Sequence, residues 1–313
     1  MTNPSAPLPT TFDPAHGNFG ALDTVPRSPT MAQIEDVLTR FAADNALLYR
    51  PRSPGPDYPG CVFATRTVFP FTYHHFSTTS GRYIDFGNLR PDSQADGVQD
   101  AGRQDPEVGA QLDISLSSEP PSWGYLALQI DRHLPNLMLI SKRRVGSGAQ
   151  LPVSPDASQA LSLEGDFDRY FTLYCPRDFE QDALYVFTPD LMALLIDEAT
   201  PFDVEIVDKW MFFYVPKPFN SLDPAVYRRL FSILTTIGSK IVSQTGRYDD
   251  AALDVAPAPV RYGFHWDPSI VPDKSLPSGE RLKVKSAIPS IVIGLVVAAG
   301  LFTLFELFAS GQL

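Results

Sequence analysis

The side chains that could support acid–base, nucleophilic or metal chemistry are few and scattered along the chain. The five histidines show no HExxH or HxH spacing, and Cys61 and Cys175 form no CxxC pair. His74 and His75 are neighbours in a segment with strand character, so their side chains should point to opposite faces and cannot hold one metal ion as a local pair. The sequence therefore predicts no metal site and no cofactor.

The sequence also lacks the usual motifs for phosphate binding and for an activated nucleophile. It contains no GxSxG elbow and no GxxxxGK[ST] loop, and Gly238-Ser239-Lys240 falls inside a predicted helix, where no free N–H groups face a ligand. Cys61 and Cys175 lie among apolar neighbours, which favours buried, unreactive thiols. His265-Trp266-Asp267 is an unusual cluster whose composition favours a packing or partner contact over catalysis. These patterns favour a non-enzymatic function.

Composition narrows the class of protein. The chain has 313 residues, with 25 Lys and Arg against 36 Asp and Glu, a formal net charge of −11. A nucleic-acid-binding face needs clustered basic residues, so this balance argues against a nucleic-acid partner. Two cysteines are too few for a disulfide-stapled scaffold. With 44% hydrophobic residues, the chain has enough apolar material for a core.

The most apolar stretch of the sequence is 287–309, which has one charge, Glu306. At about 1.5 Å per residue, a helix of this length covers roughly 34 Å, enough for the hydrocarbon core of a bilayer. Arg281, Lys283 and Lys285 precede it, and the positive-inside rule then places the N-terminal side in the cytoplasm. We therefore expect a tail-anchored, single-pass protein of the plasma (inner) membrane, with a cytoplasmic N-terminal domain and the C-terminus outside.

Three residues of this span could contact other helices. Gly294 and Ala298 form a small-xxx-small pair that would allow a second helix, and hence a homodimer, to approach closely. Glu306 could pair with a partner subunit, but its place near the end of the span favours an extension of the side chain to the interface.

The domain plan follows from composition. Residues 1–29 are Pro-rich with few periodic apolar positions, which predicts a disordered leader. A cytosolic domain is expected over 30–247, interrupted at 91–121 by an insertion with seven acidic residues and one Arg. The Pro-rich stretch 248–286 is typical of a semi-extended stalk, which would end at the membrane-spanning helix over 287–309.

Local patterns predict an α+β fold with a mostly antiparallel sheet packed against amphipathic helices, plus the C-terminal transmembrane helix. Helices are expected over 31–46 with Thr30 as cap, after Thr188-Pro189, and from Asp223-Pro224 to Gly246. A turn is expected near Pro135 and a hairpin at Asp208-Lys209. Strands are expected over 62–68, 71–75, 82–89, 124–130, 137–141, 169–175, 202–207 and 210–215.

Part of the chain resembles a domain of unknown function found in membrane-anchored bacterial proteins, chiefly of actinobacteria. The resemblance rests on the strand entry Leu134-Pro135-Asn136-Leu137, the strand 167–173, the helix pattern Thr188-Pro189-x-x-Met192-x-x-Leu195 and the segment Asp208-Lys209-Trp210. It implies a membrane-associated setting and supplies no catalytic residues.

The function expected from these features is interaction or scaffolding at the inner face of the membrane. The partners would be the bilayer, through residues 287–309, and one or more proteins. The acidic body should be repelled by anionic lipids and held away from the bilayer by the stalk. Two alternatives stay open: a membrane-tethered protein that binds a lipid-like ligand or hydrolyses a substrate at a loop-built site, and an accessory subunit of a membrane complex.

Overall fold

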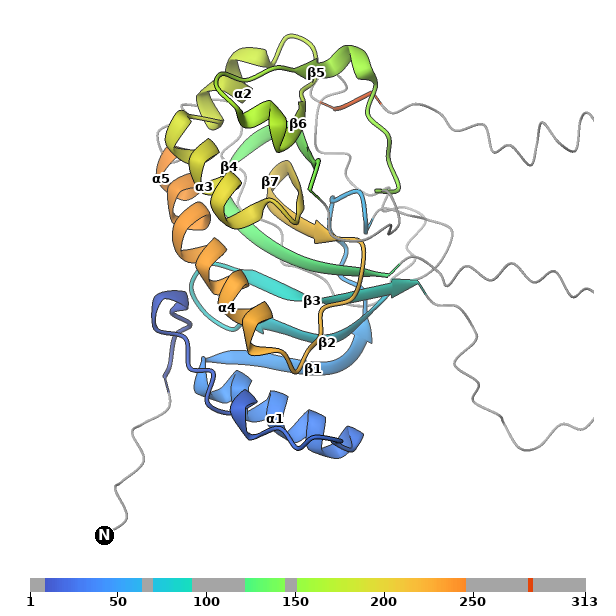
Figure 1. Ribbon diagram of the computed structural model, residues 1–313, viewed down its shortest axis with the longest axis vertical. Coiled ribbons are helices and arrows are strands. Elements are labelled where there is room, and N and C mark those ends of the chain that lie inside the picture. Colours follow the sequence, from blue (N-terminus) through green and yellow to red (C-terminus); the bar gives the residue numbers. More distant parts are fainter. Residues whose placement is uncertain (1–8, 64–69, 92–121, 144–150, 246–280, 284–313) are drawn as a thin grey trace, which may run out of the picture.

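The computed structural model describes residues 9–63, 70–91, 122–143, 151–245 and 281–283. In this part of the chain, a seven-stranded sheet carries helices on one face, and every strand pairing is antiparallel (Figure 1). The predicted α+β class with a mostly antiparallel sheet is therefore confirmed. The predicted transmembrane helix lies outside the described residues.

The sheet is organised around one long strand. The order is β1-β2-β3-β4-β6-β5, and β7 pairs with β4 as well. β3 pairs with the first half of β4 and β6 with its end, while β7 runs along most of its length. The strands are β1 Leu47–Pro54, β2 Pro70–Thr78, β3 Ile84–Pro91, β4 Trp123–Ser141, β5 Ala160–Leu161, β6 Phe171–Tyr174 and β7 Asp203–Val215.

Two predicted turns are wrong. β4 continues through Pro135, and β7 continues through Asp208-Lys209, because the two long strands pair with each other on both sides of these points. The register shifts between Gln129 and Leu137, so Pro135 lies where the ladder is already irregular. Asp208 adopts φ 57°, a left-handed conformation that Asp tolerates better than most residues. The turn-forming residues thus mark bulges within strands.

The helices follow the predicted pattern, with one difference in capping. They are α1 Met31–Asp44, α2 Glu180–Val186, α3 Pro189–Ala199, α4 Pro224–Ile233 and α5 Ser239–Thr245, the last two joined by a π-helical turn, Leu234–Gly238. Thr30 and Gln33 form a capping box on α1, and Asp223 caps α4. Thr188 does not cap α3; its hydroxyl accepts a hydrogen bond from Gln244 instead.

The two faces of the sheet bury separate apolar clusters. The helix face packs α1, α3, α4 and α5 against the sheet. On the opposite face, which we call the segment face, the chain from 55 to 63 crosses the sheet without regular secondary structure beyond a single bridge and a turn. β7 contributes to both faces as its alternation predicts. Met211, Phe213 and Val215 point to the helix face, and Trp210, Phe212 and Tyr214 to the segment face.

Three predictions about chain segments need correction. Residues 9–29 are not a disordered leader: Leu22 is buried, and the Phe19 ring lies 5.2 Å from that of Phe231. Although this stretch is rich in proline, it contains enough apolar residues to pack against the core. Val62 and Phe63 lie in a turn rather than a strand, and the rest of that predicted strand, 64–68, lies outside the described residues. Strand β1 was not predicted, because its Arg and Pro residues are typical of a loop.

Candidate functional site

Buried polar side chains gather on the segment face of the sheet, mostly beneath the crossing segment 55–63. Asp85 and His75 are fully buried, and Glu205 is 3% exposed. Charged or titratable groups seldom occupy such positions unless they are paired. They form two networks, one around Asp85 and one around Glu205.

Asp85 is the centre of the first network. Its two carboxylate oxygens accept hydrogen bonds from the hydroxyls of Tyr58, at 2.7 Å, and Tyr125, at 3.0 Å. Nδ1 of His75 lies 3.4 Å from the Oδ1 atom. Burial, and next the nearby Asp85 charge, raise the pKa of Tyr125 well above its usual value, so this phenol stays protonated and keeps donating.

His75 connects this carboxylate to a serine on the neighbouring strand. Its Nε2 atom lies 2.8 Å from Oγ of Ser53, which is half-buried on β1. Ser53 Oγ also lies 2.8 Å from the hydroxyl of Thr72. The network therefore runs from Ser53 on β1, through His75 on β2, to Asp85 on β3, and brings together a hydroxyl, an imidazole and a carboxylate.

Two backbone features position His75. The preceding residue, His74, has φ 45°, at an irregularity in the β2–β3 register between Tyr73 and Phe76. On β3, Gly87 lies directly beneath the His75 side chain, since a Cβ built on Gly87 would lie 2.5 Å from Cβ of His75. A side chain at position 87 would thus displace the imidazole.

Glu205 is the centre of the second network. Its Oε2 atom accepts from the backbone N–H of Cys61 at 2.8 Å and from the Tyr214 hydroxyl at 3.1 Å, while Asn136 donates to Oε1 at 3.2 Å. Burial raises the pKa of Glu205 despite these donors. Gly60 allows the close approach, because a Cβ there would lie 2.2 Å from the Tyr214 hydroxyl. This carboxyl fastens the crossing segment to β7.

The two cysteines are buried as predicted, although Cys61 lies in a turn. Burial, followed by the nearby Glu205, raises the pKa of the Cys61 thiol well above its usual value. Burial raises the pKa of Cys175 to about 12. Both thiols are therefore protonated at neutral pH and unreactive.

The histidines outside this network are dispersed. His74 contacts the Tyr49 hydroxyl at 2.8 Å, on the other face from His75, as the strand pattern predicts. His133 lies 3.0 Å from a carboxylate oxygen of Asp208. Within the described ranges, no three His, Cys, Asp or Glu side chains cluster closely enough to bind a metal ion.

The predicted membrane-flanking residues are partly described. Leu282 is 7% exposed and belongs to the apolar cluster of the segment face. The N–H of Lys283 donates to Gln159 at 2.7 Å, and its carbonyl accepts from the N–H of Asp156 at 2.9 Å. Residues 281–283 are thus packed on the domain rather than forming the end of an extended stalk, because Leu282 finds an apolar site there.

The remaining predicted site residues cannot be placed. Lys285, Gly294, Ala298, Glu306 and the cluster 265–267 all lie outside the described residues. None of the helices in the described ranges combines the length and apolar character that a bilayer crossing requires.

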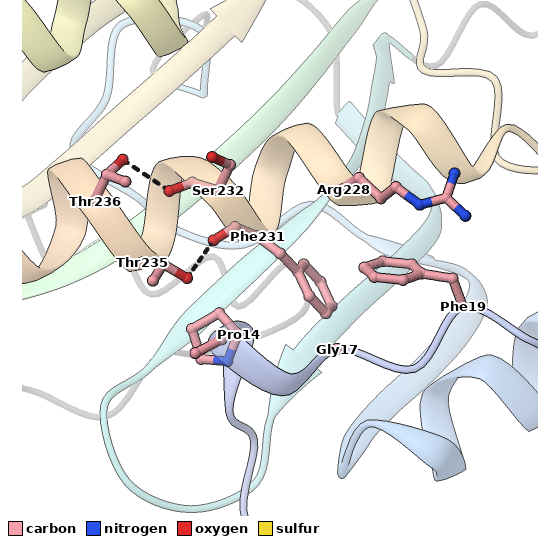
Figure 2. A pocket seen from close by; sticks show the side chains of 9 residues that line it. Pro14, Gly17, Phe19, Arg228, Phe231, Ser232, Thr235 and Thr236 are labelled. Atoms are coloured by element: carbon pink, nitrogen blue, oxygen red, sulfur yellow. Dashed lines mark hydrogen bonds between the residues drawn. The ribbon is translucent and has the colours of Figure 1, made fainter.

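An open groove of about 320 Å³ lies on the helix side, between the N-terminal turn Pro14–His16 and α4 (Figure 2). Phe19, Phe231 and Pro14 line it. The hydroxyls of Thr235 and Thr236 donate to carbonyl oxygens of their own helix, at 2.7 and 2.8 Å. These two hydroxyls already donate within their own helix. The groove therefore offers a ligand fewer polar groups than the Asp85 network does.

Comparisons with known proteins found no matching family model, curated protein or solved structure. Sequence reasoning missed the residues of both networks. Asp85 and Glu205 could have drawn attention as acidic residues within strongly apolar strand patterns. Ser53 gave no such signal, because it stands between Arg52 and Pro54 in a segment that reads as a loop.

Proposed function

We propose that this chain is a tail-anchored, single-pass protein of the plasma membrane, and that its cytoplasmic α+β domain acts as an interaction or scaffold domain close to the bilayer surface. The observation that carries the proposal is the packing of Leu282 and Lys283 on the domain, immediately before the apolar run 287–309.

The docked flank limits the distance between domain and membrane. Three residues lie between Lys283 and Ala287, where the apolar run begins, and an extended chain covers about 3.5 Å for each of the four steps from 283 to 287. If 287–309 spans the bilayer, the region around Asp156 and Gln159 lies within roughly 14 Å of the start of the span. This arrangement replaces the expectation of an acidic body held away on a long stalk.

Fluorescence quenching by lipid-attached nitroxide tests the placement of the domain, with the full chain reconstituted in vesicles. A bimane label on Ser158→Cys, beside the docked flank, should be quenched strongly. A label on Met31→Cys, in α1 at the other end of the molecule, should be quenched weakly (Figure 1). Both native cysteines are buried, so the label should react with the introduced thiol.

A matched pair of variants tests the role of the docked flank. Leu282→Asn removes a buried apolar contact and should weaken quenching at position 158, whereas Arg281→Asn, at an exposed neighbour, should leave it unchanged. Equal, weak quenching at positions 158 and 31 in the parent chain would contradict the proposed placement.

The interaction role needs a separate test. Leu184 and Tyr185 on α2 are adjacent large hydrophobic residues, 52% and 42% exposed. A photo-crosslinking amino acid at position 184 should capture a protein partner in membranes from cells that express the full chain, and one at Ser80, in an exposed turn, should not. Loss of the captured species on removal of residues 287–313 would support a membrane-bound partner; the absence of any crosslink at 184 would count against the scaffold role.

A further inference from the structure

We propose that Ser53 is an activated nucleophile, with His75 as its general base and Asp85 as the positioning carboxylate, in a site that hydrolyses carboxylic esters. The inference goes beyond the interaction function and does not depend on it. It makes specific the alternative of a hydrolytic activity, but places the site on three adjacent strands rather than on loops.

The order of the three groups is that of a serine hydrolase. The Ser53 hydroxyl lies 2.8 Å from Nε2 of His75, and Nδ1 of the same ring lies 3.4 Å from Asp85. A nucleophile, a base within hydrogen-bond reach and a third group that orients the base are the arrangement by which serine is activated on unrelated folds.

The hydrogen bonds to Asp85 favour the His75 tautomer in which Nε2 can accept a proton from Ser53. Tyr58 and Tyr125 each donate to one oxygen of Asp85, so both carboxylate oxygens are acceptors. Nδ1 of a neutral His75 must then carry the proton that faces Asp85, which leaves Nε2 as an acceptor. In this tautomer Nε2 can accept the proton of the Ser53 hydroxyl at 2.8 Å, although the same hydroxyl also lies within donating distance of the Pro54 carbonyl oxygen, at 3.3 Å.

Solvent exposure decreases from Ser53 to His75 and Asp85. Ser53 is half-buried on the edge strand β1, whereas His75 and Asp85 are completely buried behind it. An ester can therefore approach the serine from the edge of the sheet while the base and its carboxylate stay shielded from water. A low-dielectric setting of this kind strengthens the interaction between imidazolium and carboxylate when the proton is transferred.

The local backbone departs from regular sheet geometry where the imidazole is positioned. His74 is left-handed at φ 45°, an uncommon conformation for a residue within a strand, and Gly87 leaves the space that His75 occupies. The left-handed residue and the glycine lie at the same irregularity of the β2–β3 pairing, and together they place the imidazole between Ser53 and Asp85.

The reaction balances with water as the only co-reactant. Oγ of Ser53 attacks the ester carbonyl carbon as its proton passes to Nε2 of His75; the C–O bond to the leaving group then breaks, and Nε2 returns the proton to the departing alkoxide. Water next attacks the acyl–serine ester and gives a proton to Nε2, which passes it to Oγ as the carboxylic acid leaves. Asp85 orients the imidazole in both steps and takes no part in the bond changes.

A fluorophosphonate probe tests the nucleophile directly on the full-length protein. Labelling should occur at Ser53, as mapped by peptide mass spectrometry, together with hydrolysis of p-nitrophenyl butyrate. Ser53→Ala should abolish both, and Ser80→Ala, an exposed serine on the β2–β3 turn, should leave both unchanged. His75→Gln should slow both by about 10²-fold or more, as removal of a general base does.

A second variant keeps the proposal testable if His75→Gln does not fold. Ser53→Cys places a thiol against the intact imidazole, which should lower the pKa of the thiol below its ordinary value of about 8.5. The pH dependence of iodoacetamide alkylation should therefore shift to lower pH than in Ser80→Cys. Absence of probe at Ser53, or a Ser53→Cys thiol that titrates no lower than the thiol of Ser80→Cys, would overturn the proposal.

Discussion

The helix face and the segment face of the sheet bury their residues in different ways. On the helix face, helices cover the strands and the core is aromatic and aliphatic, with Phe41, Phe76 and Phe231 near its centre. On the segment face, irregular chain covers aromatic residues mixed with Asp85, His75 and Glu205.

The difference has a physical cause. A helix satisfies its own backbone hydrogen bonds, so it can cover a sheet with apolar side chains alone. The segment 55–63 has little regular secondary structure to pair its backbone groups, and buried polar side chains can serve as partners, as when Glu205 accepts from the N–H of Cys61. Buried polar groups of this kind are also the ones that can do chemistry, so the segment face is where function is to be sought.

The largest expected effect comes from removing a central ring on each face. Phe41→Ala should lower the free energy of unfolding by about 3–5 kcal/mol, because α1 and the sheet are too well ordered to fill the cavity. Phe212→Ala on the segment face should cost less, since irregular chain can relax into the space. Urea unfolding of both variants measures this, and a larger loss for Phe212→Ala would contradict the comparison.

Adding a methyl group to one glycine on each face should lower stability on the segment face but not on the helix face. Gly87→Ala places Cβ 2.5 Å from that of His75 and 2.7 Å from its backbone Cα. We expect a loss of about 1–3 kcal/mol from overpacking. In Gly238→Ala, within the helical layer, the new Cβ lies 3.3 Å from a flexible Leu128 methyl and at ordinary contact distance, 3.7 Å, from the Ile233 carbonyl oxygen. The substitution also gains helix propensity, so the stability should stay nearly unchanged.

The two glycine variants should also differ in the labelling of Ser53 by the fluorophosphonate probe. Gly87→Ala should also reduce probe labelling at Ser53, because it displaces the base, whereas Gly238→Ala should not. Thermal unfolding measures stability, and labelling measures the position of His75. Equal labelling in the two folded variants would show that Gly87 does not position His75.

The titration of Glu205 should contribute to the pH dependence of the free energy of unfolding. Its pKa is raised by burial, so the folded chain retains a proton that the unfolded chain releases as pH rises above about 4.5, the ordinary value. The free energy of unfolding contributed by this group therefore falls as pH rises from there through the folded-state pKa, with a slope of at most about 1.4 kcal/mol per pH unit.

Glu205→Gln should remove this slope, and Glu164→Gln, at an exposed position, should retain it. Urea midpoints measured across that pH range provide the comparison. A slope that persists unchanged in Glu205→Gln would assign the pH dependence to other groups.

The smallest expected effect lies at the edge of the helix face. Thr30→Ala removes the cap of α1 and should cost about 1 kcal/mol, without any change in Ser53 reactivity. Thr39→Ala, an exposed position within the same helix, is the control and should be neutral within a few tenths of a kcal/mol. A change in labelling of Ser53 in Thr30→Ala would show that the two faces are coupled.

Helices were more predictable than strand connections. Thr30, Asp223 and the apolar stripes behind them place α1 and α4, because caps and helical periodicity act within a few residues. The continuity of β7 could not be predicted in this way. Asp208-Lys209 reads as a turn, and only pairing with β4 on both sides shows that the strand continues.

The candidate site was hidden for a similar reason. His75 and Asp85 lie in strands that the alternation predicted, but nothing local brings them to Ser53. Ser53 is 22 residues before His75, in a strand that was not predicted, and Asp85 is 10 residues after it. The GxSxG elbow is a contiguous sequence pattern, whereas here the three groups meet across neighbouring strands.

The sequence by itself determined the α+β class, the main helices with their caps and the alternating faces of 210–215, because these depend on interactions between residues close in the chain. It also predicts the apolar span over 287–309. The tertiary structure alone decided the pairing of β4 with β7, the docking of Leu282 and the meeting of Ser53 with His75 and Asp85. These depend on register, on a left-handed residue at position 74 and on the space left at Gly87, which are set by contacts between distant segments.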